Sequence, residues 1–460
     1  MPNGAPDRAA LFDAERLTRS DLVAFGQSRR RRTARGEHGR WRPPASRRDP
    51  LEILRAQDAS RVQELVPIRY GRMLRSPFTF FRGSAAVMAA DLAGTPTSGI
   101  NVQACGDAHA ENFGVYASPE RQIVFDVNDF DETLPGPWEW DLKRLATSMV
   151  LAAEADGLGK RAGRDAAETI VHQYQAVLRR LARDHTVSIS YEQMNSERFL
   201  RVHDDNRSRK ILKRILHQSS KRTNEQAVRK WVRWSDGLPR FIDEPPLLEH
   251  LAPEVEDQFH TLVNRYRATL QDNRRHVLEQ YRFRDVARKV VGVGSVGMRA
   301  YIFLMQGRGG DDDLLVLQAK EAVSSVLTPY CGPSGFARHG QRVVVGQRLM
   351  QSASDPFLGW APFAAGDYYV RQLRDHKGPG GGAMVPYEFE LTSLVLGGTL
   401  ARAHARSVDP GALIGYIGSN DRLARSIAQF AMRYTDQVEE DYDRLNRAVR
   451  DGSLRVERGI

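Results

Sequence analysis

One short acidic stretch holds side chains whose types and spacing could carry out chemistry. Residues 105–116 read CGDAHAENFGVY, in which Asp107 precedes Asn112 by five positions. At that spacing a carboxylate can accept the proton of a substrate hydroxyl while the amide reaches a metal ion bound to phosphate. The stretch therefore predicts phosphoryl-group chemistry. A solvated surface loop would account for either side chain alone, but less well for the pair.

A second acidic stretch follows, and it offers carboxylates for the metal ion. Residues 123–133 read IVFDVNDFDET and contain Asp126, Asp129 and Asp131. If the chain stays extended, alternation places Asp129 and Asp131 on one face and Asp126 on the other. We expect Asp129, with Asn112, to hold Mg²⁺, and we expect Asp131 and Asp126 to be further ligands or to support the ligands.

Three glycines later in the chain have the spacing of a phosphate-binding loop. Gly292, Gly294 and Gly297, with Ser295 between them, form G-x-G-x-x-G. Alone this pattern is weak, because dinucleotide folds continue it with a helix and kinases continue it with a strand. The next residues, MRAYIFLM, favour a strand, and LLVLQAK then ends at Lys320, where a kinase carries its phosphate-binding lysine. The alternative is a plain glycine turn with a solvent-exposed lysine.

The elements that must position these groups can be read from the periodicity. A small sheet is expected between two helical regions. Strands are predicted over 286–305, 314–320 and 368–373. Helices are predicted from 49 to Pro67, over 139–153 as an amphipathic helix, through most of 160–280, and over 391–406 and 421–449.

Composition narrows the classes of function. The 460 residues carry a net charge of +10, but nine arginines against Glu37 lie in residues 27–48 alone. We expect this Arg-rich segment to be a disordered tail, with binding to nucleic acid or an acidic partner as the alternative.

The two cysteines exclude a disulfide scaffold. His109 and Glu111 lack the P-C-x-x-C of a zinc deaminase. No membrane span or signal is found, so a cytoplasmic location is expected.

The motifs resemble two known groups of proteins. GDAHAENFG and VNDFDE are similar to segments of aminoglycoside and choline kinase-like phosphotransferases. RMLRSPFTFFRG, CGDAHAENFG, VNDFDET, LQAKEA, GQRLMQ, YYVRQLRDHKG and YTDQVEEDY resemble the uncharacterised bacterial DUF2252 family over nearly the whole chain. The first resemblance implies an α+β, bilobal kinase-like fold that binds ATP and Mg²⁺. It assigns Asp107 as the base, Asn112 and Asp129 to the metal, and Lys320 and the glycine loop to phosphate.

The order of these motifs departs from that of a kinase, because Asp107 comes 185 residues before Gly292. A circular permutation restores the usual order, and coincidental motifs in unrelated domains are the alternative. The expected parts are a tail at 1–48, a large helical lobe at 49–285, a small β-rich lobe at 286–377, and helices at 378–460 that complete the large lobe.

The lysine also lacks its usual partner. Kinases pair it with a glutamate on a helix of the small lobe, but the expected helix GQRVVVGQRLMQS carries Gln341 and Gln347 instead. Glu321, next to Lys320, points to the other face of the strand. Either a glutamine substitutes, or an acid arrives from elsewhere in the chain.

Three functions stay open. A phosphotransferase acting on a hydroxyl of an unknown small molecule or protein is expected. The same groups could instead transfer the nucleotide, with ATP bound in a reversed pose. A nucleotide-binding pseudokinase that works through partners is the non-enzymatic reading, whereas binding of membranes, or of nucleic acid outside the Arg-rich segment, is not expected.

Overall fold

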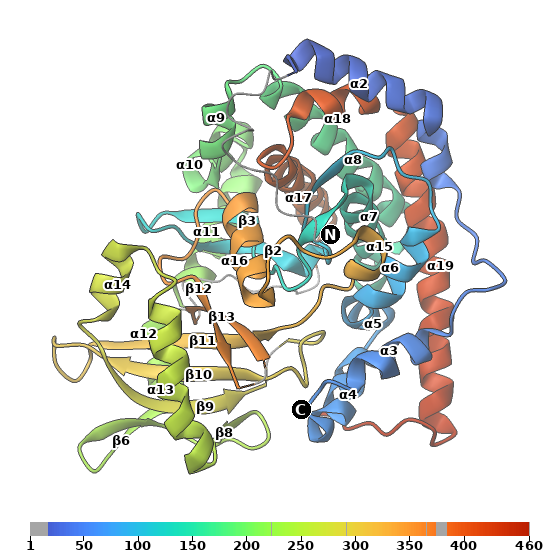
Figure 1. The fold of residues 1–460 in the computed structure, drawn as a ribbon. Coiled ribbons are helices and arrows are strands. Elements are labelled where there is room, and N and C mark those ends of the chain that lie inside the picture. The colour runs from blue at the N-terminus through green and yellow to red at the C-terminus, as the bar shows by residue number, and fades with distance from the viewer. Residues whose placement is uncertain (1–16, 222, 291, 365, 374–383, 460) are drawn as a thin grey trace, which may run out of the picture.

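A six-stranded antiparallel sheet forms one side of the molecule and helices form the other (Figure 1). The computed structural model describes residues 17–221, 223–290, 292–364, 366–373 and 384–459. Described residues within 224–373 form the sheet side, and the other described residues form the helical side. Several smaller sheets accompany the large one. The expected α+β class is confirmed.

The helical elements and strands have the following bounds. The α-helices are α2 (Arg19–Arg32), α3 (Pro50–Asp58), α4 (Val66–Met73), α5 (Pro77–Gly83), α6 (Ala85–Ala93), α7 (Trp138–Ala155), α8 (Gly159–Leu181), α9 (Thr186–Tyr191), α10 (Ser196–Val202), α11 (Asn206–Ser220), α12 (Asn224–Trp231), α13 (Pro253–Arg267), α14 (Asp272–Leu278), α15 (Thr328–Cys331), α16 (His339–Met350), α17 (Pro386–Ala405), α18 (Pro410–Ile417) and α19 (Arg422–Arg450). The 3₁₀ helices are η1 (Arg35–Gly39), η2 (Gln63–Leu65) and η3 (Ala110–Asn112). The strands are β1 (Asn101–Ala104), β2 (Phe113–Ala117), β3 (Ile123–Val127), β4 (Leu134–Pro137), β5 (Met194–Asn195), β6 (Val232–Ser235), β7 (Leu238–Phe241), β8 (Leu248–His250), β9 (Arg282–Lys289), β10 (Ala300–Gln306), β11 (Leu314–Ala322), β12 (Gly359–Phe363) and β13 (Gly366–Gln372).

The large sheet has the order β12-β13-β11-β10-β9-β8, and its two faces bury different residues. Tyr301 and Phe303 of β10 pack with α13 on one face, while Ile302 and Leu304 pack with α12 on the other. This alternation follows from the period of two in a strand. On β11 the same rule places Lys320 on the face that α12 covers only in part. The predicted strands are confirmed, and β8 extends the sheet to residues that we had assigned to the helical lobe.

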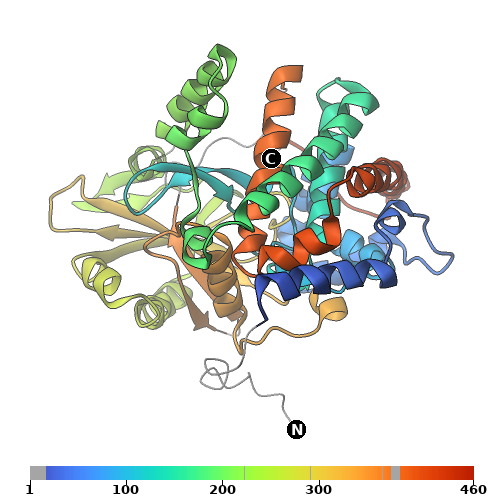
Figure 2. The same ribbon diagram turned by 90° about the horizontal axis from the view of Figure 1, so that it is seen from above.

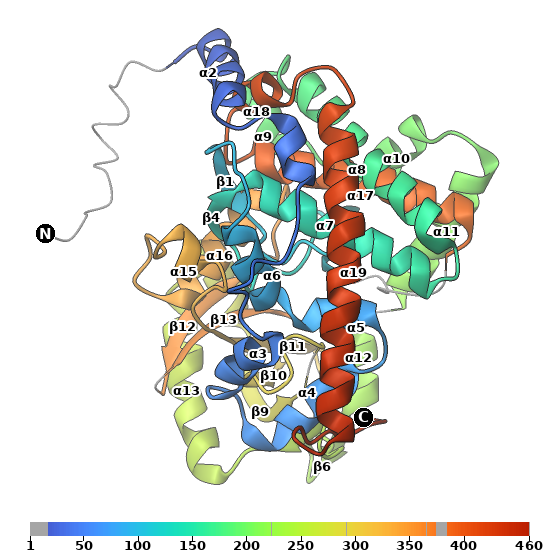
Figure 3. The ribbon, with the colours of Figure 1, turned by 90° about the vertical axis from the view of Figure 1, so that its right-hand side faces the viewer.

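The helical side packs around α7, which was predicted as an amphipathic helix over 139–153. The helix is present, but residues 138–153 are buried all round. Other helices cover it, including α8 and the long α19, which runs the height of this side in Figure 3. Buried charged groups on α7 therefore need partners inside the protein. None of the described helices is both long and apolar enough to cross a membrane.

The prediction of a disordered Arg-rich tail is wrong for residues 17–48, while residues 1–16 lie outside the described part of the chain. Helix α2 lies alongside α18 (Figures 2 and 3). A Cβ on Gly26 would lie 2.1 Å from the carbonyl oxygen of Ala412, so the two backbones touch. Trp41 is buried against α19. The segment is ordered by packing that its charge pattern does not reveal.

Its arginines cap a helix. Arg30 donates to the carbonyl oxygens of Tyr416 and Gly415, and Arg35 donates to that of Ile417. The last carbonyls of a helix lack partners within the helix and carry partial negative charge, so guanidinium groups stabilise this end of α18. These arginines bind the protein itself.

Two local predictions also need correction. Pro67 does not end a helix but lies in the first turn of α4, where its missing N–H costs nothing. The run 160–280 is mostly helical with an interruption at Gly237, as expected, but the chain on either side of that break forms the β6–β7 hairpin and not helix ends. The predicted lobe boundary near residue 377 falls outside the described residues.

Candidate functional site

The loop that carries Asp107 is held by the buried helix α7. It follows β1, which pairs with β4. The carboxylate of Asp141 on α7 accepts the backbone N–H groups of Cys105 at 2.6 Å and Gly106 at 2.9 Å. His404 of α17 lies 3.1 Å from the same carboxylate. These contacts fix the start of the loop against the helical core.

Asp107 itself is paired with an arginine of α7. The Nε atom of Arg144 lies 2.6 Å from Oδ1 of Asp107. Burial raises the pKa of Asp107 to about 6, although the charge of Arg144 opposes this increase. Such a carboxylate is ionised at neutral pH and can accept a proton.

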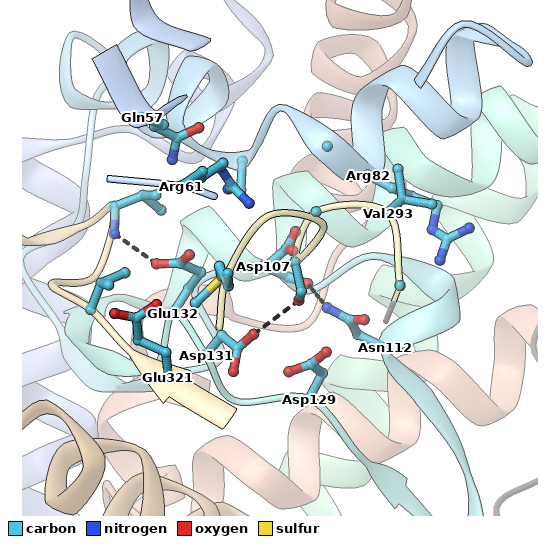
Figure 4. Close-up of a pocket in the computed structure, with 18 of the residues that line it drawn as sticks. Gln57, Arg61, Arg82, Asp107, Asn112, Asp129, Asp131, Glu132, Val293 and Glu321 are labelled. Carbon is cyan, nitrogen blue, oxygen red and sulfur yellow. Dashed lines mark hydrogen bonds between the residues drawn. The ribbon is translucent and has the colours of Figure 1, made fainter. Parts of the chain in front are cut away.

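Asn112 is oriented by the same loop. Its Nδ2 atom donates to the backbone carbonyl of Asp107 at 2.8 Å (Figure 4). With the amide nitrogen used in this way, its oxygen is the atom that remains for a cation, and oxygen is the ligand that Mg²⁺ prefers. The pair predicted from a five-residue spacing is thus joined by a hydrogen bond.

Asp129 and Asp131 lie in the loop between β3 and β4, because β3 ends at Val127. Asp131 accepts the hydroxyl of Tyr369 at 2.8 Å and that of Ser295 at 3.3 Å, and it forms an ion pair with Lys320. Its oxygens therefore already have partners within the protein. Asp129 lines the cleft beside it.

Lys320 obtains its acidic partner from the other side of the cleft. It is 3 % exposed. Burial lowers its pKa, but the carboxylates of Asp129 and Asp131 outweigh that effect and hold the pKa above its usual value. Glu321 instead pairs with Arg299. Gln347 of α16 lies in the same cleft and donates to Gln351, so no helix glutamate is used.

The glycine loop joins β9 to β10, so a strand does follow the glycines, and Lys320 lies on the next strand, as predicted. Gly292 and Gly297 have φ values of +65° and +86°, which glycine adopts without steric cost. Arginines from the helical side hold the loop by its carbonyls: Arg61 donates to Val296, and Arg72 donates to Gly292.

These groups line two adjoining cavities, which we name outer and inner. The outer cavity has a volume of about 320 Å³, and it is lined by Asp107, Asn112, Asp129, Asp131 and Glu132 together with Gly292, Gly294 and Ser295 (Figure 4). The inner cavity has a volume of about 250 Å³, and it is lined by Lys320, Gln318, Gln347, Gln351, Arg371 and Gln372. Asp129, Gly292 and Ser295 line both and form the neck between them.

Two singled-out residues have other surroundings. Asp126 does not line either cavity; its carboxylate accepts the backbone N–H of Ser352 and lies 3.5 Å from Arg406. Asp126 is therefore held by groups outside the two cavities. His109 lines the outer cavity, where burial lowers its pKa well below the usual value, so it is neutral. Its Nδ1 has no hydrogen-bond partner among the described residues.

Sequence reasoning missed several residues that line the cleft or hold its loops in place. Arg144 and Asp141 could have been found, because they are among the charged residues in the first half of the helix EWDLKRLATSMVLAA, whose second half is mostly apolar. Glu132 lines the outer cavity, and burial raises its pKa to about 7. Arg371 gave no signal, because a lone arginine in a strand is usually solvated.

The oxygen atoms that line the cleft are better suited to Mg²⁺ than to a metal ion whose ligands all come from the protein. Within the described residues, no group of three or more His, Cys, Asp or Glu side chains is placed to hold a metal ion. Mg²⁺ needs fewer protein ligands, because it is commonly bound by one or two protein oxygens together with phosphate oxygens and water. The carboxylate of Asp129 and the amide oxygen of Asn112 could supply those protein oxygens.

Comparison with known proteins identifies a family but no activity. A family model described as "Uncharacterized protein conserved in bacteria (DUF2252)" matches residues 61–448. No curated protein and no solved structure matches the chain.

Proposed function

The chain belongs to the DUF2252 family, whose description assigns no activity, and we propose from its cleft that it is an ATP- and Mg²⁺-dependent, kinase-like transferase that acts on a hydroxyl group. The observation that carries this proposal is the meeting of distant motifs. Asp107 and Asn112 line the outer cavity together with the glycine loop, although Gly292 comes 185 residues after Asp107. Asp129 lines the inner cavity together with Lys320. Unrelated domains would not place these groups together.

The arrangement of the elements supports a permuted kinase-like fold. Strands β9, β10 and β11 are consecutive and antiparallel, with the glycine loop after the first and Lys320 on the third. Kinases use the same order of loop and lysine. On the helical side, β1 and β4 pair beside the Asp107 loop and the Asp129 loop. Reading the sheet side before the Asp107 loop gives the order of a kinase.

The roles of the side chains follow from their contacts. Asp107 would accept the proton of the acceptor hydroxyl, and Arg144 would hold it in place. Asn112 and Asp129 would hold Mg²⁺, which offsets phosphate charge and aligns the reacting groups. Lys320 would bind phosphate oxygens, and the glycine loop would cover them. The acceptor, a small molecule or a protein, would enter through the outer cavity.

A second candidate is transfer of the nucleotide instead of the terminal phosphoryl group. It uses the same residues with ATP reversed, and the polar lining of the inner cavity favours it. A pseudokinase that only binds nucleotide is weakened by the presence of both Asp107 and Asn112 in one hydrogen-bonded loop.

Nucleotide binding tests the proposal directly. ATP should bind more tightly with Mg²⁺ than with a chelator, as measured by titration calorimetry. Asp129→Asn should weaken the metal-dependent part by about tenfold or more, because a carboxylate ligand is lost. Glu120→Gln, in the exposed turn between β2 and β3, is the matched control and should change nothing. Absence of ATP binding to the wild-type protein under both conditions would refute the proposal.

A further inference from the structure

The inner cavity is lined by several amide side chains and by Lys320 and Arg371, together with the carboxylates of Asp129 and Asp355. Four glutamines contribute: Gln318 on β11, Gln347 and Gln351 at the end of α16, and Gln372 on β13. Arg371 on β13 lies directly opposite Gln318 and also lines the cavity. Such a lining is poor for an apolar ring, but it offers many hydrogen-bond donors.

The register of the sheet directs Arg371 into this cavity. Arg371 pairs with Gln318, as Tyr369 pairs with Lys320, so all four lie on one face. Among the described residues its guanidinium has one hydrogen bond, to the carbonyl of Asn128 at 3.2 Å. A guanidinium has five N–H donors, and an oxyanion is the group that it binds best.

The outer cavity is different in charge. Five carboxylates line it, from Asp107, Asp129, Asp131, Glu132 and Glu321, against two arginines. Both arginines are engaged, since Arg61 donates to Val296 and Arg82 pairs with Glu111 at 2.7 Å. The inner cavity has Lys320 and Arg371 against the carboxylates of Asp129 and Asp355, so the end of a nucleotide with the highest negative charge is more favourable there than in the outer cavity.

We propose that the inner cavity is a polyphosphate subsite, in which Arg371 and the amide of Gln318 bind the terminal phosphates of ATP. This inference rests on the proposed nucleotide-dependent function and specifies the pose of the nucleotide. The nucleoside then lies toward the outer cavity, and the α-phosphate lies at the neck formed by Asp129, Gly292 and Ser295.

This pose changes the group that is transferred. The acceptor oxygen attacks the α-phosphorus, and the bond from that phosphorus to the oxygen bridging the α- and β-phosphates breaks. Pyrophosphate leaves, the acceptor gains a nucleotidyl group, and Asp107 takes the hydroxyl proton. The reaction is a nucleotidyl transfer.

Competition with two fragments of ATP tests the pose. Inorganic tripolyphosphate and adenosine are each titrated against the full chain with Mg²⁺. In the Arg371→Gln variant, tripolyphosphate should bind about 10- to 100-fold more weakly, while adenosine affinity should not change. Arg348→Gln is the control, because Arg348 lies on α16, donates to the carbonyl of Leu358 and lines neither cavity. Gln318→Leu provides a second variant if Arg371→Gln does not fold.

The outcomes separate the two proposals. Loss of tripolyphosphate affinity in Arg371→Gln or Gln318→Leu, with pyrophosphate as the released product, supports the subsite. Weaker adenosine binding with unchanged tripolyphosphate binding would overturn it and place the base in the inner cavity, leaving a phosphotransferase. If wild-type protein bound ATP under neither condition, the proposed function itself would fail.

Discussion

On the helical side of the cleft, Asp107 is paired with Arg144, and both belong to one continuous segment of the chain. On the sheet side, Lys320 is paired with Asp131, which comes from the helical side 189 residues away. The first pair can form without the sheet. The second forms only when the two sides meet, so it links the position of the phosphate-binding lysine to closure of the cleft.

The difference between the pairs also separates their expected roles. The arginine keeps the buried Asp107 ionised near neutral pH and in position to accept a proton. The carboxylate of Asp131 compensates a buried ammonium group, and without it Lys320 would have one fewer negative neighbour. We therefore expect changes on the helical side to affect turnover and changes at the junction to affect stability.

The largest effect is expected from Asp107→Asn. The fold and ATP affinity should be retained, while turnover falls by roughly 10² to 10⁴, because base assistance is lost. ATP consumption and the intact mass of a modified acceptor, or of the protein itself, measure it. Equal residual activity in the wild type and the variant would point to a contaminant and would leave a nucleotide-binding scaffold as the better account.

The next largest effect is expected at the junction. Asp131→Asn should lower the free energy of unfolding by about 3 kcal/mol, because Lys320 stays buried without its ion-pair partner. Asp129→Asn should lower it less, since the ion pair between Lys320 and Asp131 remains. Urea denaturation of both variants measures the difference. A smaller effect for Asp131→Asn than for Asp129→Asn would contradict the assigned pairing.

A smaller effect tests whether the Arg-rich segment belongs to the helical side. Gly26→Ala should destabilise the protein by about 1–3 kcal/mol, because the new methyl group would collide with the backbone of α18. Gly36→Ala is the matched control: a Cβ there meets nothing within 4 Å. Its effect should stay within about 0.5 kcal/mol in thermal unfolding. Equal stability of the two variants would mean that α2 does not dock in solution.

The smallest effect concerns a pH-dependent contact within the sheet side. His250 of β8 lies 3.2 Å from Asp285 and 2.9 Å from Asp243, which raise its pKa to about 9. Because the pKa of His250 is higher in the folded state, its protonated form stabilises the fold fully at pH values below the unfolded-state pKa of about 6.5. This stabilisation is lost as the pH rises toward 9. Relative to His250→Gln, the wild type should therefore lose stability between these pH values. Parallel curves for the two proteins would exclude this contribution.

Local pattern predicted much of the framework. The strands around the glycines, the strand that ends near Lys320 and the helices at α7, α17 and α19 all follow from periodicity and turn residues. The loop pair of Asp107 and Asn112 was also visible, because a five-residue spacing within one loop keeps both side chains close. Local pattern wrongly predicted disorder for the Arg-rich segment, because the order of this segment depends on the carbonyls of α18, far along the chain.

The sequence by itself determined which groups are available for chemistry: a base and an amide in one loop, carboxylates in the next, and a lysine two strands after a glycine loop. Only the tertiary structure decided that Asp131 and not a helix glutamate pairs with Lys320, and that Arg371 faces the cleft among four glutamines. The physical reason is the distance along the chain over which each kind of interaction acts. Strand period and loop spacing act over a few residues, whereas the partner of a buried charge is whichever opposite charge the packing brings within a few ångströms.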